Sequence, residues 1–154
     1  MNAVAKTNVI VMADDDADDR LLAKDAFAEA CMQGDLHFVE DGEDLLDYLF
    51  HRGKYDAAAS APRPRLILLD LNMPKKDGRE VLREIRADPD LRRIPVVVLT
   101  TSQADTDIAI IYELGANSFI TKPVKFDALV KVLKVIDEYW FHTVEIPTAK
   151  RASL

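Results

Sequence analysis

The sequence predicts an α/β protein with a doubly wound, five-stranded parallel sheet. Along its 154 residues, short apolar runs alternate five times with stretches of helical periodicity, which is the order of repeated βα units. The apolar runs lack polar alternation, as is typical of strands that are covered on both faces. Right-handed crossovers between such units place helices on both sides of the sheet.

Apolar periodicity defines the elements of the first half of the chain. Two apolar runs stop abruptly at an aspartate, and the stretches between runs show apolar residues three and four positions apart. In order, we predict a strand at Val9–Ala13, a helix that ends near Gly34, a strand at Leu36–Val39, a helix over the stripe from Leu45 to Phe50, and a strand at Leu66–Leu69. Residues 52–65, with two prolines, are expected to form a surface loop.

The second half alternates in the same way. Three consecutive valines at 96–98 are the strongest strand signal in the chain, because β-branched residues favour strands. Gly115 is a typical helix stop. In order, we predict a helix at Gly78–Ala87, a strand at Ile94–Leu99, a helix at Ala104–Leu114, a strand at Ser118–Thr121 and a helix at Lys125–Trp140.

The composition is that of one soluble globular domain, with 49% hydrophobic and 31% charged residues. Cys31 is the only cysteine, so no intramolecular disulfide can form and a reducing compartment is expected. The apolar run before Asp14 is too short for a signal peptide or a membrane span. We therefore expect a cytoplasmic protein whose core spans residues 7–140, with tails at 1–6 and 141–154.

The residues that follow the predicted strands carry the candidate chemistry. The carboxyl ends of parallel strands share one edge of the sheet, and ligands bind there, where the strand order switches. The first strand leads to Asp14, Asp15 and Asp16, the third to Asp70, the fourth to Thr100 and Thr101, and the fifth to Lys122. We expect the carboxylates, Thr100 and Lys122 to line one cleft.

Several carboxylates in one cleft repel each other unless a cation joins them. Mg²⁺ prefers oxygen ligands and keeps several waters, so two carboxylates, a backbone carbonyl and waters would suit it. No histidine, cysteine or glycine-rich phosphate loop falls at this edge. Asp70 is then the candidate nucleophile, because an aspartate can attack phosphorus and form an acyl phosphate. The metal, Lys122 and Thr100 would offset the charge on the phosphoryl oxygens.

Two alternative functions compete with this one. A phosphatase of the haloacid-dehalogenase kind also uses an aspartate nucleophile, but it needs a second aspartate two residues later, where this chain has Asn72. A flavodoxin-like binding module needs a hydroxyl- and glycine-rich loop after the first strand. This chain has aspartates there, which would repel a phosphate.

Four segments together resemble the receiver domain of two-component response regulators, over roughly residues 7–140. They are VIVMADD at 9–15, LILLDLNMPKKDG at 66–78, VVVLTTS at 96–102 and FITKP at 119–123. The resemblance implies the flavodoxin-like (βα)5 receiver fold. It also implies a protein that accepts a phosphoryl group from a sensor histidine kinase. Such a protein is not an enzyme, although it assists its own phosphorylation and dephosphorylation.

The same resemblance assigns roles to individual residues. Asp70 would be the phosphoacceptor, and Thr100 and Lys122 would bind the phosphoryl oxygens. Thr100 and Phe119 would act as the switch residues. The Mg²⁺ ligands would be Asp14, Asp15, Asp70 and the backbone carbonyl of Asn72. The spacing to the aspartates at 18 and 19 favours Asp14 and Asp15 over Asp16 as the acid pair. The aromatic switch residue lacks the hydroxyl that often occurs at this position, so one hydrogen bond of the switch is expected to be missing.

A narrower resemblance points to the kinase. PKKDGREVL, the insertion before the third strand, DPDLRRIPVVVLTTS and the ending DEYWFHTVEIP resemble small stand-alone regulators that partner bacterial phytochrome histidine kinases. This resemblance implies a phytochrome-type kinase as the phosphodonor.

The last two predicted helices carry more apolar residues than one core-facing stripe needs, and a helix that is apolar nearly all round is buried on more than one side. We therefore expect a homodimer through the fourth helix, the fifth strand and the fifth helix, with Val144 and Ile146 contacting the partner. Residues 142–154 are too few for a DNA-binding domain, and a net charge of −7 disfavours non-specific nucleic-acid binding. We expect protein partners, with no nucleic acid and no membrane.

Overall fold

The computed structural model of the chain describes residues 8–57, 60–101 and 105–147. The expected tail at 1–6 lies outside the described residues, and so do residues 148–154 of the expected tail at 141–154. Ala104, the predicted start of the fourth helix, also lies outside them.

The predicted parallel sheet is confirmed. Its strands are β1 (Val9–Ala13), β2 (Asp35–Val39), β3 (Leu66–Leu69), β4 (Val96–Thr100) and β5 (Ser118–Thr121). They pair in the order β2-β1-β3-β4-β5, and every pairing is parallel. The order reverses between β1 and β3, which places the expected ligand site beyond the carboxyl ends of these two strands.

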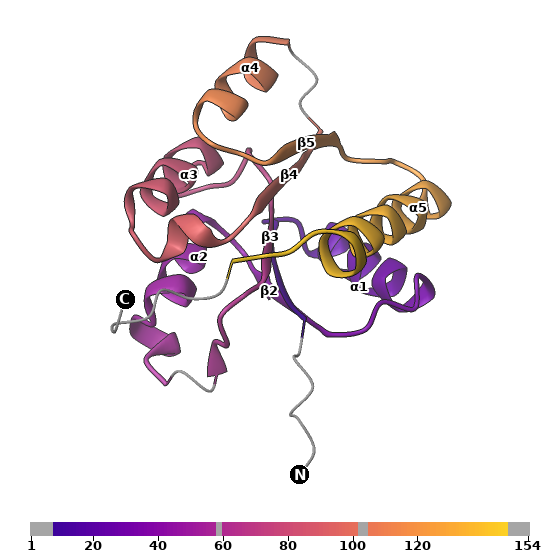
Figure 1. Cartoon of the computed structure of the whole chain (residues 1–154), viewed down its shortest axis with the longest axis horizontal. Helices are drawn as coiled ribbons and strands as arrows, with labels where there is room; N and C mark the ends of the chain where they lie inside the picture. Colours follow the sequence, from indigo (N-terminus) through magenta and orange to yellow (C-terminus); the bar gives the residue numbers. More distant parts are fainter. Residues whose placement is uncertain (1–7, 58–59, 102–104, 148–154) are drawn as a thin grey trace.

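Helices cover both faces of the sheet, as Figure 1 shows. They are α1 (Ala17–Glu29), α2 (Gly42–Phe50), α3 (Gly78–Ala87), α4 (Asp105–Glu113) and α5 (Phe126–Asp137), with short 3₁₀ segments at η1 (Gly53–Tyr55) and η3 (Leu91–Arg93). α1 and α5 pack side by side on one face, and α2, α3 and α4 lie on the other.

Side-chain alternation along the central strands fills two cores. Val11 and Ala13 of β1 pack with buried residues of α2 and α3, whereas Ile10 and Met12 pack with buried residues of α1 and α5. Successive side chains of a strand point to opposite faces, so a strand covered on both sides needs apolar residues throughout. β1, β3 and β4 are accordingly buried along their whole length, and the edge strands β2 and β5 are partly exposed.

The first helix is shorter than predicted. α1 ends at Glu29, not near Gly34, because the chain turns at Cys31, whose φ of 56° lies in the left-handed region. Gly34 lies instead in the turn into β2, with a φ of 125°. A Cβ at this position would lie 2.2 Å from the carbonyl oxygen of Asn8. The glycine therefore allows a close backbone approach to the sheet and does not mark the helix end.

The insertion between α2 and β3 was predicted to be a surface loop, but part of it packs on α2. The Tyr55 hydroxyl donates to Asp44 at 2.8 Å, and the Tyr48 hydroxyl donates to the carbonyl oxygen of Pro62 at 2.7 Å. Ala61 is fully buried in the core on this side. The described part of the insertion thus extends the core, and hydrogen bonds from two tyrosine hydroxyls join it to α2.

The last helical run continues beyond its predicted end at Trp140. α5 passes directly into a π-helical segment at Glu138–Thr143, and the N–H of Val144 donates to the carbonyl oxygen of Tyr139 at 3.0 Å. Val144 and Ile146 are each half-buried within the single chain. None of the helices in the described part of the chain combines the length and the apolar character that crossing a bilayer requires.

Gly78 begins α3 against the backbone that follows β3. A Cβ there would lie 2.7 Å from the carbonyl oxygen of Asp70 and 2.8 Å from the Cα of Leu71. Both are backbone atoms, so Gly78→Ala must displace α3 or this loop, and we expect it to lower the free energy of unfolding by about 2 kcal/mol. Urea denaturation measures the change. Glu80→Ala, at an exposed position of the same helix, is the control, and equal effects of the two substitutions would contradict the close packing.

Candidate functional site

The carboxyl ends of β1, β3, β4 and β5 bring Asp14, Asp70, Thr100 and Lys122 together. Asp14 follows β1 and donates its backbone N–H to the last residue of β2 at 3.1 Å. Asp70 follows β3 and donates its N–H to the last residue of β1, also at 3.1 Å. Lys122 follows β5 and donates its N–H to the carbonyl oxygen of Thr100 at 2.7 Å. These bonds continue the parallel ladders by one residue. The backbone of Asp14, Asp70 and Lys122 is therefore held in position by the sheet.

Asp70 accepts from three donors although only 9% of its surface is exposed. Thr100 Oγ1 donates to Oδ1 at 2.9 Å, and the N–H of Asn72 donates to the same oxygen at 3.2 Å. Lys122 Nζ donates to Oδ2 at 3.3 Å. Thr100 is fully buried, so its hydroxyl has no solvent partner and is fixed on the aspartate. The carboxylate is thereby oriented and is not a buried, unpaired charge.

The ammonium group of Lys122 lies among three carboxylates. Its Nζ donates to Asp14 Oδ2 at 2.6 Å, to Asp19 Oδ2 at 3.2 Å and to Asp70 Oδ2 at 3.3 Å. The Asp14 side chain is only 1% exposed, so this pairing balances a charge that would otherwise be buried without a counter-ion.

Burial and pairing act in opposite directions on the pKa values of this pair. Burial acts to lower the pKa of Lys122, but its hydrogen bond to Asp14 and the charges of Asp70, Asp14 and Asp19 outweigh this effect and raise it. Burial raises the pKa of Asp14, and the hydrogen bonds from Lys122 and from the N–H of Asp16 only partly oppose that rise. The lysine therefore stays charged at neutral pH, beside Asp70.

The three consecutive aspartates after β1 have different environments. Asp16 caps α1, because its side chain accepts from the N–H groups of Asp18 and Asp19 at 2.8 and 3.2 Å. Asp14 is buried and Asp15 is exposed. Asp16 is thus engaged at the start of α1, and the assignment of Asp14 and Asp15 as the acid pair remains a prediction.

Asp14, Asp15 and Asp70 form a group that can bind a divalent metal ion. Each offers a carboxylate oxygen, and these three oxygens lie within 4.8 Å of one another. Oxygen-only donors of this kind suit a hard cation such as Mg²⁺ or Mn²⁺, so the residues present fit the expected ion. The backbone carbonyl of Asn72 as a fourth ligand remains a prediction.

Two residues near the site were missed by sequence reasoning. Asp19, in the first turn of α1, reaches Lys122, and Arg20 donates to the carbonyl oxygen of Asp14 at 2.8 Å. An acidic residue in a first helical turn is common because it stabilises the helix dipole, so the sequence offered no sign that Asp19 faces the cleft. Phe119 is half-buried and packs against the core on the α2–α3 face, and its role in switching remains a prediction.

The fold and the site define a class of protein. The chain belongs to the response regulator receiver domain family, whose model matches residues 10–134. The expected family is thereby confirmed.

Particular members of the family are similar over most of the chain. Response regulator Rcp1 of Synechocystis is 43% identical over 141 residues, which cover 92% of this chain and 94% of Rcp1. The crystal structure of its Mn²⁺-bound form is similar with a TM-score of 0.81 at 42% identity, over 92% of this chain and 99% of that one. The phosphorylated cyanobacterial phytochrome response regulator RcpA gives a TM-score of 0.84 at 43% identity, over 93% and 100%. A response regulator in red light signaling of R. palustris gives 0.87 at 36% identity, over 92% and 99%.

Metal binding at the acidic cluster predicts a rise in melting temperature, since a ligand that binds only the folded state stabilises it. At a Mg²⁺ concentration about 100 times its dissociation constant, the gain is about 2.7 kcal/mol. Asp15→Asn removes an exposed ligand and is expected to abolish most of this rise, whereas Asp18→Asn, at an exposed position of α1, should keep it. Thermal melts with Mg²⁺ and with a chelator measure the difference. Identical curves for the wild-type protein would contradict the metal site.

Proposed function

We propose that this response regulator accepts a phosphoryl group on Asp70 from a sensor histidine kinase and signals through a change of conformation. The observation that carries the proposal is the position of Asp70. Its carboxylate lies at the tip of β3, held by Thr100 Oγ1 at 2.9 Å and Lys122 Nζ at 3.3 Å, with oxygens of Asp14 and Asp15 within 4.8 Å. A candidate nucleophile, two donors for phosphoryl oxygens and a group of carboxylates that can bind a metal ion thus lie together.

Asp70 supplies the nucleophile in the proposed reaction. One carboxylate oxygen attacks the phosphorus of a phosphohistidine. A bond from phosphorus to oxygen forms as the bond from phosphorus to nitrogen breaks, and the electron pair leaves with the imidazole. Thr100 and Lys122, which both donate to Asp70 before transfer, would donate to the phosphoryl oxygens as charge gathers on them. Mg²⁺ held by Asp14, Asp15, Asp70 and the carbonyl of Asn72 would supply further positive charge.

The phosphoryl group adds a charge of about −1.5 to −2 at the tip of β3. The Thr100 hydroxyl, which donates to Asp70 in the free protein, is expected to move onto a phosphoryl oxygen, and Phe119 to follow as the second switch residue. The N–H of Phe119 donates to the hydroxyl of Tyr112 at 3.2 Å, which supports coupling of β5 to α4. Attack of water on the acyl phosphate would later restore Asp70 and reset the switch.

The proposed phosphodonor is a phytochrome-type histidine kinase. RcpA is described as a cyanobacterial phytochrome response regulator, and a further similar structure, at 38% identity and a TM-score of 0.75, is a bacteriophytochrome response regulator. Both similarities span more than nine-tenths of this chain. They support a kinase partner of the same kind here.

The proposed role is that of a phosphoacceptor, not of an enzyme with an external substrate. Asn72 stands where a phosphatase of the haloacid-dehalogenase kind needs its second aspartate, so steady hydrolysis of small phosphate esters is not expected. We propose a receiver core at residues 7–140, with tails at 1–6 and 141–154, and a cytoplasmic location in which the exposed Cys31 stays reduced.

A homodimer through α4, β5 and α5 is the proposed assembly. Exposed apolar side chains lie on both helices: Ile110 is 40% exposed on α4, and Val135 is 66% exposed on α5. Tyr139 follows Val135 by one helical turn and is 50% exposed. Val135 and Tyr139 form an apolar stripe with the half-buried Val132 along α5 and its continuation. Burial of this stripe against a second copy would explain its composition.

Phosphorylation on Asp70 is directly testable. The wild-type protein incubated with a phosphorylated phytochrome kinase and Mg²⁺ should gain one phosphoryl group, and Asp70→Asn should gain none because the amide is not a nucleophile. Intact-protein mass spectrometry reads the gain, and circular dichroism checks that the variant is folded. Asp77→Asn, at the cap of α3, is the control and should still be phosphorylated. Label on the Asp70→Asn protein would contradict the assignment.

The dimer interface predicts a specific sensitivity to charge. Val135→Glu is expected to weaken self-association at least tenfold, which corresponds to about 1.4 kcal/mol, because the new carboxylate would be buried in the interface. Lys134→Glu, at an exposed position of the same helix that lies off this stripe, should have a smaller effect. Sedimentation velocity over a concentration series measures the change. A wild-type protein that is monomeric at high micromolar concentration, phosphorylated or not, would refute the dimer.

A further inference from the structure

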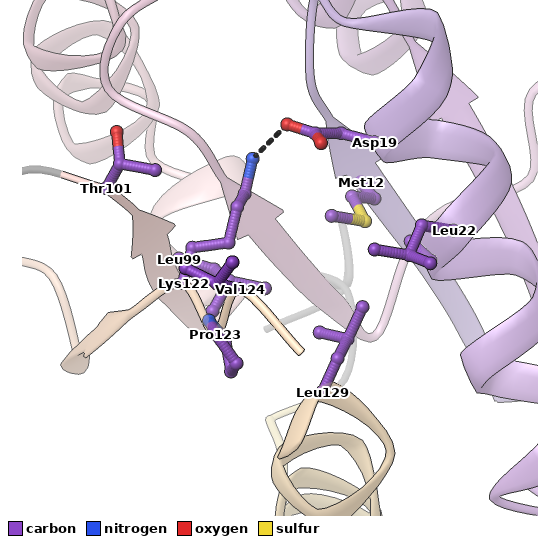
Figure 2. A pocket seen from close by; sticks show the side chains of 10 residues that line it. Met12, Asp19, Leu22, Leu99, Thr101, Lys122, Pro123, Val124 and Leu129 are labelled. Atoms are coloured by element: carbon purple, nitrogen blue, oxygen red, sulfur yellow. Dashed lines mark hydrogen bonds and ion pairs between the residues drawn. The ribbon is translucent and has the colours of Figure 1, made fainter. Parts of the chain in front are cut away.

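The side chain of Lys122 lies beside empty space. A cavity of about 190 Å³ lies between α1 and the connection from β5 to α5, next to the aliphatic stem of Lys122. Its apolar lining comes from Met12, Leu22, Ala23, Leu99, Pro123, Val124 and Leu129. Figure 2 shows Lys122 and Asp19 reaching towards each other beside this lining. The lysine therefore borders open space on the side of α1.

Polar contacts at the tip of the side chain must then decide where the ammonium group lies. A lysine has three N–H donors, and the described structure offers three carboxylate acceptors, one from each of Asp14, Asp19 and Asp70. The distance to Asp14 is the shortest, at 2.6 Å, and the distance to Asp70 is the longest, at 3.3 Å. Two of its three acceptors, on Asp14 and Asp19, are thus residues other than the nucleophile.

Asp19 differs from the other two acceptors in its exposure. Its side chain is 43% exposed, against 1% for Asp14 and 11% for Asp70, and it belongs to α1, not to a strand end. Asp19 does not belong to the candidate metal site, which consists of Asp14, Asp15 and Asp70. Its contact within the cleft is to Lys122.

We propose that Asp19 is a positioning residue for Lys122, which holds the ammonium group towards α1 and so slows phosphorylation of Asp70. This inference rests on the proposed function. For transfer, the ammonium group must turn to the incoming phosphoryl oxygens beside Asp70, and the contact with Asp19 opposes that movement. The carboxylate of Asp19 also holds one of the donors that a phosphoryl group needs. Loss of its charge should free the lysine while Asp14 still anchors it.

The test compares Asp19→Asn with a matched control, Asp18→Asn. Both positions lie in the first turn of α1, and both substitutions remove one negative charge from the same helix end. Within the described part of the chain, the Asp18 carboxylate forms no ion pair, so only the first substitution changes the environment of Lys122. The probe is phosphoramidate with Mg²⁺, and intact-protein mass spectrometry gives the rate at which Asp70 is phosphorylated.

We expect Asp19→Asn to raise the phosphorylation rate about fivefold over Asp18→Asn, the equivalent of about 1 kcal/mol, which is the upper end of what an ion pair with an exposed partner contributes. Asp19→Glu keeps the charge and the acceptor, and it should stay within about twofold of the wild-type rate. Equal rates for Asp19→Asn and Asp18→Asn would overturn the inference, because the effect would then be one of overall charge.

A spectroscopic measurement separates positioning from other causes. The ¹⁵N signal of the Lys122 ammonium group should shift in Asp19→Asn and not in Asp18→Asn, and an unchanged signal in both variants would overturn the inference. Failure of the proposed function gives a different result, since the wild-type protein itself would then take up no phosphoryl group. If the wild-type protein is phosphorylated and the two variants behave alike, only the inference about Asp19 fails.

Discussion

The contact between one ammonium group and several carboxylates is the constraint on which the site depends. Asp14 and Asp70 follow neighbouring strands and are both nearly buried, and two such charges repel each other in a poorly solvated cleft. Lys122 lies 2.6 Å from the first and 3.3 Å from the second. Its positive charge balances both carboxylates and so allows them to lie close together.

The topology of the sheet makes this contact possible across a long stretch of chain. Lys122 and Asp14 are 108 residues apart in sequence, yet the parallel order β2-β1-β3-β4-β5 brings all strand ends to one edge. Local backbone requirements keep the edge compact. Gly78 lets α3 begin against the backbone of Asp70, and Asp16 caps α1 so that the chain turns directly after the acidic pair. The geometry of the site thus depends on Gly78 and Asp16, although neither residue is proposed to contact the phosphoryl group or the metal ion.

Features that are encoded within one short segment, such as the bounds of a buried strand, could be predicted from sequence. The bounds of β1, β3 and β5 were predicted correctly, because polar or turn-forming residues follow directly where each strand ends. The end of α1 could not be predicted, because the left-handed turn at Cys31 gives no signal in the residue type. The contact of Asp19 with Lys122 was hidden for another reason: it depends on how α1 packs beside the end of β5, which periodicity does not report.

The central claim is that the Asp70 carboxylate becomes an acyl phosphate, and chemical trapping tests it most directly. Borohydride reduces an aspartyl phosphate to homoserine, and mass spectrometry of peptides locates the new residue. After phosphorylation of the wild-type protein in Mg²⁺, the account predicts homoserine at position 70. Homoserine at another aspartate, or a phosphoryl group that resists borohydride and remains on a histidine or a hydroxyl side chain, would contradict it.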